Sequence, residues 1–184
     1  MTFKAIVDEH VSCIKSLASI EADIVRAGNL LSETIRAGRT IFICGNGGSA
    51  ADAQHFAAEL VGRFERERKA LPALALTTDT SIITALSNDY SYDAIFARQV
   101  WALGRPGDLL LGISTSGHSE NVLLAMEAAG KTGLKTIGLL GRDGGKIKQK
   151  ADEAVIVPHH ITARIQEAHI LILHFWAHLI EAGV

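Results

Sequence analysis

The sequence predicts an α/β protein built on a doubly wound, parallel, five-stranded sheet. Five short apolar runs lack the polar alternation of half-exposed strands, and such runs are typical of strands buried on both faces of a parallel sheet. Segments with helical spacing separate most of these runs, as in folds whose strands and helices alternate. The expected strands are 40–44, 73–77, 108–114, 136–140 and 154–157.

Before the first strand, the chain has the apolar periodicity of amphipathic helices. The periodicity runs over 3–18 and, after a break near Ser19, over 24–35. We therefore expect an N-terminal helical segment, 1–37, followed by an α/β core, 38–184, in one domain. Such helices cover either their own sheet or a second subunit.

Helices are also expected between the strands and after the last of them. They are 48–64, 80–103, 118–132, 143–150 and a long apolar helix over 162–182. Doubly wound folds bind their ligands at the carboxyl ends of the strands. The loops at those ends are 44–49, 77–81, 114–119 and 140–145.

The composition is that of a packed globular protein. Of the 184 residues, 48% are hydrophobic and 21% are charged. A net charge of −2 gives no general attraction for nucleic acids or anionic membranes. The basic run 63–69 contains interleaved glutamates, which indicates a solvated helix end rather than a nucleic-acid patch.

The sequence lacks the features of membrane-spanning and disulfide-stabilised proteins. No apolar run approaches the roughly 18 residues that span a bilayer, and the N-terminus has no signal pattern. Cys13 lies in a helical pattern and Cys44 in a strand-like run, so no disulfide framework is expected. We therefore expect a soluble, cytoplasmic protein.

The first of the ligand loops, 44–50, reads Cys-Gly-Asn-Gly-Gly-Ser-Ala between a strand and a helix. Its glycines let the backbone approach a ligand, and the N–H groups at the helix start favour an anion. Gly45, Gly47 and Ala50 also fit a dinucleotide fingerprint, which needs an acidic residue at the end of the next strand, about 20 residues on. The next expected strand ends near Thr77, so an anion site is favoured over a nucleotide site or a simple tight turn.

The loop 114–119 reads Ser-Thr-Ser-Gly-His-Ser and carries four hydroxyl groups. Hydroxyl and backbone N–H groups together can satisfy most oxygen atoms of a phosphate without a cation. Capping the following helix would need only one of these hydroxyls. No lysine follows in the G-K-[ST] order of a nucleoside-triphosphate loop, so the pattern predicts a phosphate site of another kind.

These two loops together resemble those of the SIS (sugar isomerase) family, whose flavodoxin-like fold has the architecture predicted above. Further segments resemble, within that family, the enzymes that isomerise phosphoheptoses. These segments are 50–59, 76–79, 88–89 and 163–170. The similarity covers almost the whole chain.

Aldose–ketose isomerisation needs a base at carbon and an acid–base group at oxygen. His55 and Glu59 lie four residues apart, on one face of the helix that starts in the first loop, although such pairs are also common on helix surfaces. The C-terminal helix adds four polar candidates: Gln166, His169, His174 and His178. By spacing alone, His174 and His178 form the best metal-binding pair, and exposed or internally bonded histidines are the alternative.

The resemblance implies a more definite assignment. It implies that Glu59 is the catalytic base and that His174 is its acid–base partner. It also implies one zinc ion per subunit, held near His55, Glu59, Gln166 and His174. Gln166 and His174 are roughly 12 Å apart along a helix, so they either reach one ion within a chain or come from two subunits.

The remaining contacts that the resemblance implies are with a phosphosugar. The residues that would hold the sugar chain and its hydroxyls are Asn46, Gly47, Gly48, Glu59, Asn88, Asp89 and Gln166. The residues that would hold the phosphate are Ser114, Thr115, Ser116 and Ser119.

The implied activity is the conversion of sedoheptulose 7-phosphate to D-glycero-D-manno-heptose 7-phosphate through an enediol, at the start of ADP-heptose synthesis for lipopolysaccharide. The implied assembly is a homo-oligomer, a tetramer with sites at subunit interfaces, without a nucleic-acid or membrane partner. Two alternatives stay open: an isomerase of a shorter ketose phosphate, and a non-enzymatic adaptor that binds a replication initiator. Adaptors of this family lack the glutamate and the histidine that this chain has at Glu59 and His174.

Overall fold

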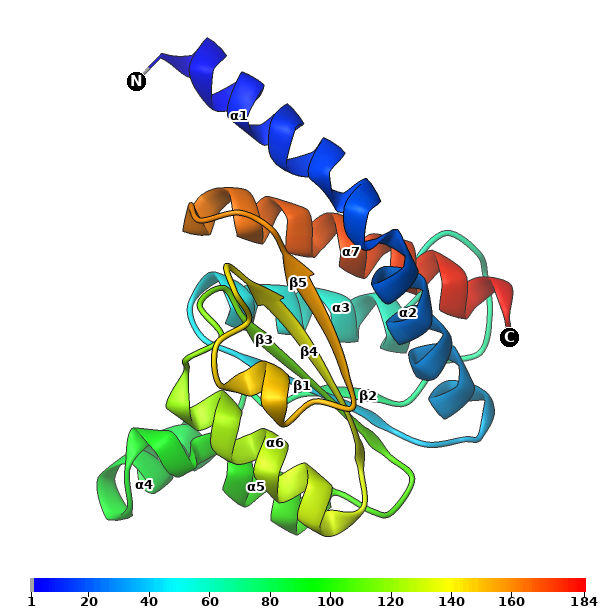
Figure 1. Cartoon of the computed structure of the whole chain (residues 1–184). Helices are drawn as coiled ribbons and strands as arrows, with labels where there is room; N and C mark the ends of the chain where they lie inside the picture. Colours follow the sequence, from blue (N-terminus) through cyan, green and yellow to red (C-terminus); the bar gives the residue numbers. More distant parts are fainter. Residues whose placement is uncertain (1) are drawn as a thin grey trace.

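A computed structural model describes residues 2–184, and it contains the predicted parallel sheet (Figure 1). The strands are β1 Ile41–Gly45, β2 Ala73–Ala75, β3 Leu109–Ser114, β4 Lys135–Gly141 and β5 Glu153–Val157. All neighbouring strands are parallel, in the order β2-β1-β3-β4-β5. The predicted fold class is confirmed, because each apolar run of the sequence forms one strand.

The strand order changes direction between β1 and β3. From β1 the chain continues to β2 at one edge, and it then crosses to β3 on the other side of β1. Cys44 and Gly45 of β1 pair with Gly112 and Ile113 of β3. The loops that follow these two strands therefore leave the sheet side by side, at the kind of position where doubly wound folds bind ligands.

Helices cover both faces of the sheet and enclose two hydrophobic cores (Figure 1). The helices over the first core are α2 (Glu21–Arg36), α3 (Gly48–Val61) and α7 (Thr162–Ala182). The helices over the second core are α4 (Thr80–Asp89), α5 (Ile95–Leu103) and α6 (Glu120–Thr132). Successive side chains of a strand point to opposite faces, so Ile43 enters the first core and Cys44 the second.

The predicted helix over 80–103 is wrong, because two helices occupy this segment. α4 ends at Asp89, and α5 begins only at Ile95, after a 3₁₀ turn at Tyr92–Ala94. Ser91 has the extended conformation of a strand, which no continuous helix can contain.

The predicted helix over 143–150 is also wrong, since only a 3₁₀ turn forms at Ile147–Gln149. Gly144 and Gly145 have φ angles of 81° and 51°. Right-handed helices require negative φ, so the chain enters this segment as a turn.

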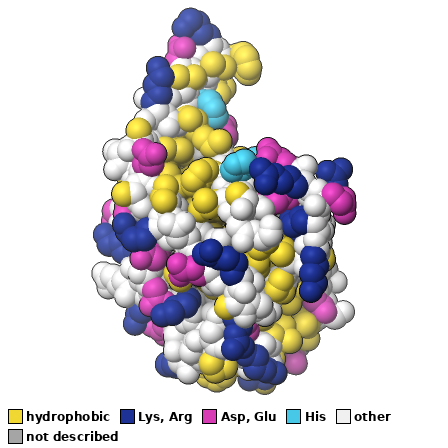
Figure 2. All heavy atoms as spheres, turned by 90° about the vertical axis from the view of Figure 1, so that its right-hand side faces the viewer, with side chains coloured by type: hydrophobic (Ala, Val, Ile, Leu, Met, Phe, Trp, Pro, Cys, Tyr) yellow, Lys and Arg dark blue, Asp and Glu magenta, His cyan; other side chains and the backbone are white. Residues whose placement is uncertain are grey.

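The two N-terminal helices separate at the predicted break. A 3₁₀ turn at Leu17–Ile20 joins α1 (Phe3–Ser16) to α2, and α1 extends away from the body of the molecule (Figure 1). Figure 2 shows hydrophobic side chains along this projecting helix and on the adjoining surface. Within residues 2–184, no helix has the length and apolar character needed to cross a membrane.

The basic run after α3 is a loop, so the expected solvated helix end is wrong. The side chain of Arg68 is only 9% exposed, and its Nε atom lies 3.2 Å from Oε1 of Glu181 in α7. The Glu181 carboxylate also accepts hydrogen bonds from the backbone N–H groups of residues 64–66. Burial alone would raise the pKa of Glu181, but these N–H groups and Arg68 lower it. The Arg68 guanidinium also donates to the carbonyl oxygen of Glu59, so the loop is fixed to both α3 and α7.

Candidate active site

The first ligand loop joins β1 to α3 and receives side chains from two other helices. Gly48 opens α3, and a Cβ atom at this position would overlap the side-chain amide of Gln166. Glycine at position 48 therefore lets Gln166 of α7 lie against the loop. Asn46 forms two hydrogen bonds with Asn121 in the first turn of α6.

The loop after β3 gathers its hydroxyl groups at the start of α6. The Oγ atom of Ser114 lies 2.9 Å from that of Ser119 and 3.5 Å from that of Ser116. Gly117 has a φ of 69°, and a side chain there would collide with the carbonyl of Gly144. Glycine thus allows the loops after β3 and β4 to pack together, and three hydroxyls converge where the helix N–H groups favour an anion.

His55, Glu59 and His174 form a compact cluster between α3 and α7. The Nε2 atom of His55 lies 2.9 Å from Oε1 of Glu59 and 3.4 Å from Nε2 of His174. One ligand atom from each of the three residues lies within 4.8 Å of the others. The sequence left open whether Glu59 and His174 meet within one chain, and in the structure they do.

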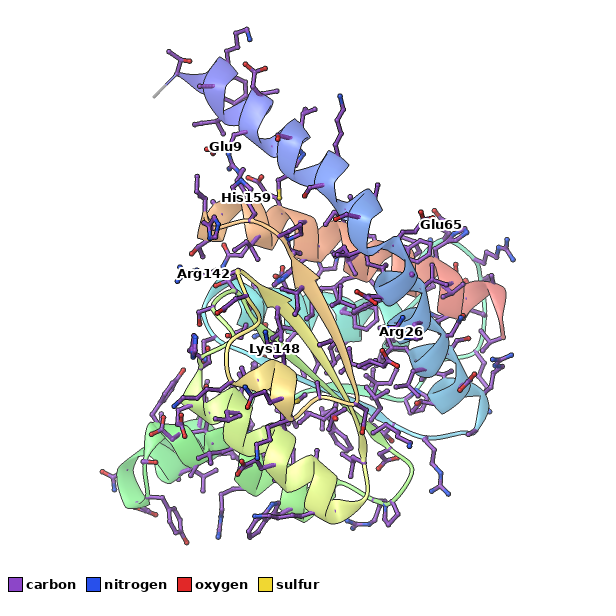
Figure 3. The ribbon with its side chains drawn as sticks, viewed as in Figure 1. Glu9, Arg26, Glu65, Arg142, Lys148 and His159 are labelled. Carbon is purple, nitrogen blue, oxygen red and sulfur yellow. The ribbon has the colours of Figure 1, made fainter. Side chains whose placement is uncertain are left out.

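The other histidines of α7 have different partners. Nδ1 of His178 lies 3.1 Å from Oε2 of Glu65, which stands beside the C-terminal half of α7 (Figure 3). The pair of His174 and His178 that spacing alone favoured is therefore not formed. His169 is fully buried, and its Nε2–H donates to the Leu140 carbonyl at 3.0 Å. Burial lowers the pKa of His169 to about 4.

Buried His169 should make the protein less stable in acid. Its folded-state pKa of about 4 lies below the ordinary value of 6.5, so the unfolded chain binds a proton first as the pH falls. The free energy of unfolding should therefore decrease by about 3 kcal/mol between pH 6.5 and pH 4. His169→Gln keeps a donor for Leu140 but cannot titrate. The stability difference between wild type and this variant should therefore shrink as the pH falls.

Urea unfolding at several pH values, with EDTA present to keep metal away from the histidines, measures this difference. A difference of the same size at pH 7 and pH 4 would show that His169 is not held neutral by burial.

The segment after α4 is tied to the first ligand loop. Asn88 and Asp89 are exposed at the end of α4, and Nδ2 of Asn88 donates to Oδ1 of Asp89 at 2.8 Å. Three residues later, the Tyr92 hydroxyl donates to Oδ1 of Asn46 at 2.9 Å. Thr115 is half-buried in the hydroxyl loop. These expected substrate residues thus lie on segments that converge at the carboxyl ends of β1 and β3.

Sequence reasoning missed Asp52, which lies one turn before His55 on α3. Burial raises the pKa of Asp52 to about 6, and the neighbouring His55 opposes this rise. The Oδ2 atom of Asp52 is buried and has no hydrogen-bond partner within residues 2–184. Its i, i+3 spacing to His55 is a signal in the sequence that could have found it.

Two aromatic residues and an asparagine were missed as well. Phe64 stacks on His174 with ring centroids 5.6 Å apart, and Tyr92 bonds Asn46. Asn121 lies two residues after the hydroxyl loop, and this position in the sequence could have identified it as a site residue. Phe64 comes from a loop and Tyr92 from a 3₁₀ turn, and only the folded chain brings them to the site.

Comparison with known proteins identifies the family. A family model of the SIS domain matches residues 7–141. A phosphoheptose isomerase from a Nitratiruptor species is 53% identical over 178 residues, which cover 97% of this chain and 95% of the relative. A phosphoheptose isomerase from Helicobacter pylori is 56% identical over 167 residues, which cover 91% of this chain and 87% of the relative. The chain belongs to the phosphoheptose isomerase family.

Two solved structures of phosphoheptose isomerases have the same fold along nearly their whole length. The structure from Neisseria gonorrhoeae is 46% identical and has a TM-score of 0.92, with 97% of this chain and 96% of that chain covered. The structure from Francisella tularensis is 38% identical and has a TM-score of 0.95, with 99% and 100% covered.

In this member of the phosphoheptose isomerase family, the His–Glu–His cluster is a group that can hold a metal ion. Catalytic zinc sites commonly use three histidine or carboxylate ligands and keep a fourth position open. The Nε2 atom of His55 lies 3.4 Å from that of His174 and 2.9 Å from Oε1 of Glu59, so the three candidate ligand atoms are close enough to share one ion. Imidazole nitrogens and carboxylate oxygens are ligands that zinc accepts, so the donor set fits zinc.

Proposed function

We propose that this protein is a sugar-phosphate isomerase that converts sedoheptulose 7-phosphate to D-glycero-D-manno-heptose 7-phosphate through an enediol. The observation that carries the proposal is the approach of Glu59 and His174, whose ligand atoms lie within 4.8 Å of each other. The relatives are named phosphoheptose isomerases, which supports the same substrate class. A non-enzymatic adaptor has no need for this cluster, so the cluster favours an enzyme.

The proposed reaction moves a proton between two adjacent carbon atoms. Glu59 takes a proton from C1 of the open-chain ketose, the electron pair forms the C1–C2 double bond, and His174 gives a proton to O2. The resulting enediol then loses the proton of O1 to His174 while Glu59 returns a proton to C2. The aldose leaves with both residues in their starting states. One carboxylate can serve both carbons because they are neighbours.

We also propose one zinc ion per subunit, with His55, Glu59, Gln166 and His174 as its ligands. Bound zinc would supply positive charge that polarises the carbonyl group and stabilises the enediolate. A carboxylate that binds a metal is a weaker base, and an imidazole nitrogen that binds a metal cannot also hold a proton for O2. The two roles proposed for Glu59 therefore compete with each other, and so do the two proposed for His174. Metal analysis of the Glu59→Gln variant separates the two roles of Glu59.

The remaining polar residues would bind the substrate from its two ends. The phosphate would be held by Ser114, Thr115, Ser116 and Ser119. The convergence of three of these hydroxyl groups supports this assignment. The groups proposed for the sugar chain and its hydroxyls are Asn46, Gly47, Gly48, Asn88, Asp89 and Gln166. Segments tied together by Asn46 carry most of these groups, which supports a common site.

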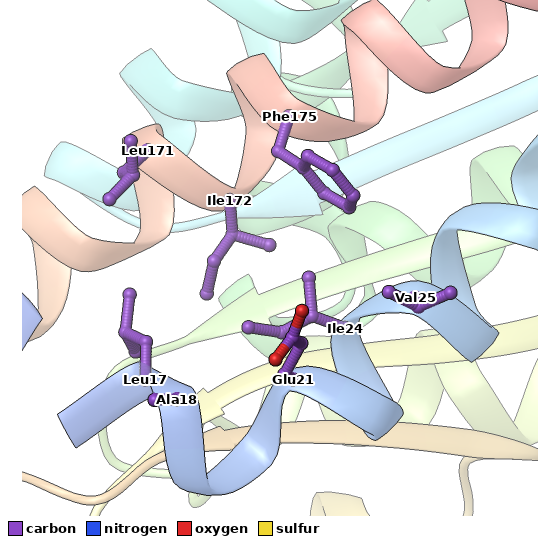
Figure 4. Close-up of a pocket in the computed structure, with 8 residues that line it drawn as sticks. All are labelled: Leu17, Ala18, Glu21, Ile24, Val25, Leu171, Ile172 and Phe175. Atoms are coloured by element: carbon purple, nitrogen blue, oxygen red, sulfur yellow. The ribbon is translucent and has the colours of Figure 1, made fainter. Parts of the chain in front are cut away.

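We propose a cytoplasmic homotetramer that supplies heptose for lipopolysaccharide. An apolar groove of about 400 Å³ between α2 and α7 supports an assembly of subunits, because large hydrophobic surfaces are seldom left exposed without a partner (Figure 4). Its lining residues are Leu17, Ala18, Glu21, Ile24, Val25, Leu171, Ile172 and Phe175. Sedimentation equilibrium tests the tetramer, and a monomer would contradict it.

The test of the activity is an NMR assay of the purified protein with sedoheptulose 7-phosphate and zinc. We expect signals of the aldose to appear and the ketose signals to decrease. No conversion by a folded, zinc-supplied protein would contradict the proposal. Conversion of shorter ketose phosphates instead would identify an isomerase of another substrate, and no conversion of any would favour the adaptor.

Removal of the Ser119 hydroxyl should weaken binding of the phosphate. Ser119→Ala removes one hydrogen bond to a charged group, so we expect KM to rise about 10-fold or more with little change in kcat. Ser116→Ala should behave similarly. Ser19→Ala is a matched control, because that exposed hydroxyl donates to the Ser16 carbonyl in the turn after α1, far along the chain from the hydroxyl loop. An unchanged KM in both Ser116→Ala and Ser119→Ala would show that the phosphate does not bind at this loop.

Removal of metal should abolish turnover and lower the melting temperature. Dialysis against a chelator takes away the proposed zinc, which would bind the folded chain more tightly than the unfolded one. We expect activity to return on addition of zinc, and metal analysis to give one ion per subunit before dialysis. His55→Ala should bind no zinc by the same analysis. If neither activity nor melting temperature responds, the protein does not use a metal.

A further inference from the structure

We propose that Tyr92 and Asn121 are positioning residues that fix the side-chain amide of Asn46, so that Asn46 presents a single N–H donor to the sugar. The inference rests on the proposed function and extends it to two residues outside the expected site. It follows from a chain of hydrogen bonds whose direction is set by a backbone group.

The chain begins at Asn121, which is 2% exposed in the first turn of α6. Its Oδ1 atom accepts the backbone N–H of Val122 at 2.9 Å. A backbone N–H can only donate, so this contact determines which end of the Asn121 amide is the oxygen. The other end of the amide is then a donor.

Asn121 in turn fixes the orientation of Asn46. Nδ2 of Asn121 donates to Oδ1 of Asn46 at 2.8 Å, and Nδ2 of Asn46 donates back to Oδ1 of Asn121 at 2.9 Å. If the Asn46 amide were flipped, its oxygen would face Oδ1 of Asn121 and its nitrogen would face Nδ2 of Asn121, and both hydrogen bonds would be lost. Tyr92 adds a second bond to the same oxygen, since its hydroxyl donates to Oδ1 of Asn46 at 2.9 Å.

The Asn46 amide therefore has one hydrogen-bonding group left. Its oxygen accepts two hydrogen bonds, and one of its two N–H groups is used by Asn121. The second N–H is bonded to no acceptor among residues 2–184, and it belongs to the loop that carries Gly47 and Gly48. Asn46 can thus only donate to a ligand, and the group it meets is an acceptor oxygen, a hydroxyl or carbonyl of the sugar.

The same bonds join three segments that are separate in the sequence. Asn46 follows β1, Asn121 follows the hydroxyl loop, and Tyr92 follows Asn88 and Asp89. The Tyr92 side chain is 54% exposed, so its hydroxyl positions Asn46 without contributing much to the core. Loss of this hydroxyl should change substrate binding and leave the fold intact.

Tyr92→Phe tests the proposal, with Tyr90→Phe as the matched control. Tyr90 is 60% exposed, and its ring lies under the Arg98 guanidinium rather than at the ligand loops. Loss of one neutral hydrogen bond should raise KM for sedoheptulose 7-phosphate about 3- to 10-fold in Tyr92→Phe, with kcat unchanged. Tyr90→Phe should keep the wild-type KM.

A double-mutant cycle shows whether Tyr92 acts through Asn46. In the Asn46→Ala background, Tyr92→Phe should have no further effect on KM, because the amide it positions is gone. An equal increase of KM in both backgrounds would overturn the proposal and make Tyr92 a direct substrate contact. An unchanged KM in Tyr92→Phe alone would overturn it as well.

A measurement without substrate keeps this test separate from the proposed activity. The Asn46 side-chain amide is assigned as the ¹⁵N signal that Asn46→Ala lacks, and its order parameter reports how firmly it is held. We expect the order parameter to decrease in Tyr92→Phe and to stay unchanged in Tyr90→Phe. No decrease in Tyr92→Phe would overturn the positioning role, even if the wild type converts sedoheptulose 7-phosphate. A decrease in Tyr92→Phe would support the positioning role even if the wild type does not convert sedoheptulose 7-phosphate.

Discussion

Replacement of Glu59 by glutamine should lower kcat by about 10²–10⁴-fold, the usual contribution of a general base. Glutamine keeps the volume of the side chain and one oxygen acceptor, but it cannot take a proton from carbon. Binding of the phosphosugar should therefore stay within a few-fold of wild type. NMR turnover of sedoheptulose 7-phosphate measures the first quantity, and titration calorimetry of the phosphosugar measures the second.

Glu65→Gln is the matched control for this variant. Glu65 also pairs with a histidine, His178, at 3.1 Å, but the pair is exposed and lies outside the cluster. We expect this control to retain full activity. Full activity in Glu59→Gln would exclude Glu59 as the base. If Glu59→Gln loses both phosphosugar binding and turnover, the substitution has disturbed the site. The zinc content of the variant would then indicate whether the metal was lost.

Replacement of Glu181 by glutamine should lower the free energy of unfolding by about 3–5 kcal/mol, because it removes the carboxylate counter-ion of the buried Arg68 guanidinium. Both side chains are almost inaccessible, at 9% exposure for Arg68 and 3% for Glu181. The carboxylate also accepts three backbone N–H groups, for which a neutral amide is a weaker acceptor. The melting temperature should decrease by roughly 10 °C, which differential scanning calorimetry measures.

Glu67→Gln is the control for the stability measurement. Glu67 is exposed, and its carboxylate lies 3.9 Å from Nε of Arg63 on the same loop. Exposed ion pairs contribute little, so this variant should stay within about 0.5 kcal/mol of wild type. An equally small effect in Glu181→Gln would mean that the buried pair does not hold the loop.

The sheet was predictable because a strand buried on both faces must be apolar at every position, and that pattern is visible in the sequence. The break between α4 and α5 was not predictable in this way. It lies at Ser91, which is extended, and at Tyr92, whose hydroxyl donates to Asn46 on another loop. The burial of Arg68 was also hidden. Its local sequence is that of a solvated segment, and its partner Glu181 lies on α7, far along the chain.

The two ligand loops were predictable from glycines and hydroxyls that follow buried strands. Only part of the His–Glu–His cluster was predictable from residue spacing. His55 and Glu59 share a helix face, which spacing predicts, but spacing also favoured His178 over His55 as the companion of His174. Which turn of α7 faces α3 is decided by packing, and the family resemblance supplied what the spacing could not.

The last helix has a consequence for the order in which the molecule assembles and opens. α7 follows all five strands in the sequence, and it carries both His174 and Glu181. If α7 detaches while the sheet persists, His174 leaves Glu59, and the loop at 64–66 loses the carboxylate that holds it. The proposed catalysis by Glu59 and His174 would then last only while α7 stays docked, so a local opening of this one helix would stop turnover before the sheet unfolds.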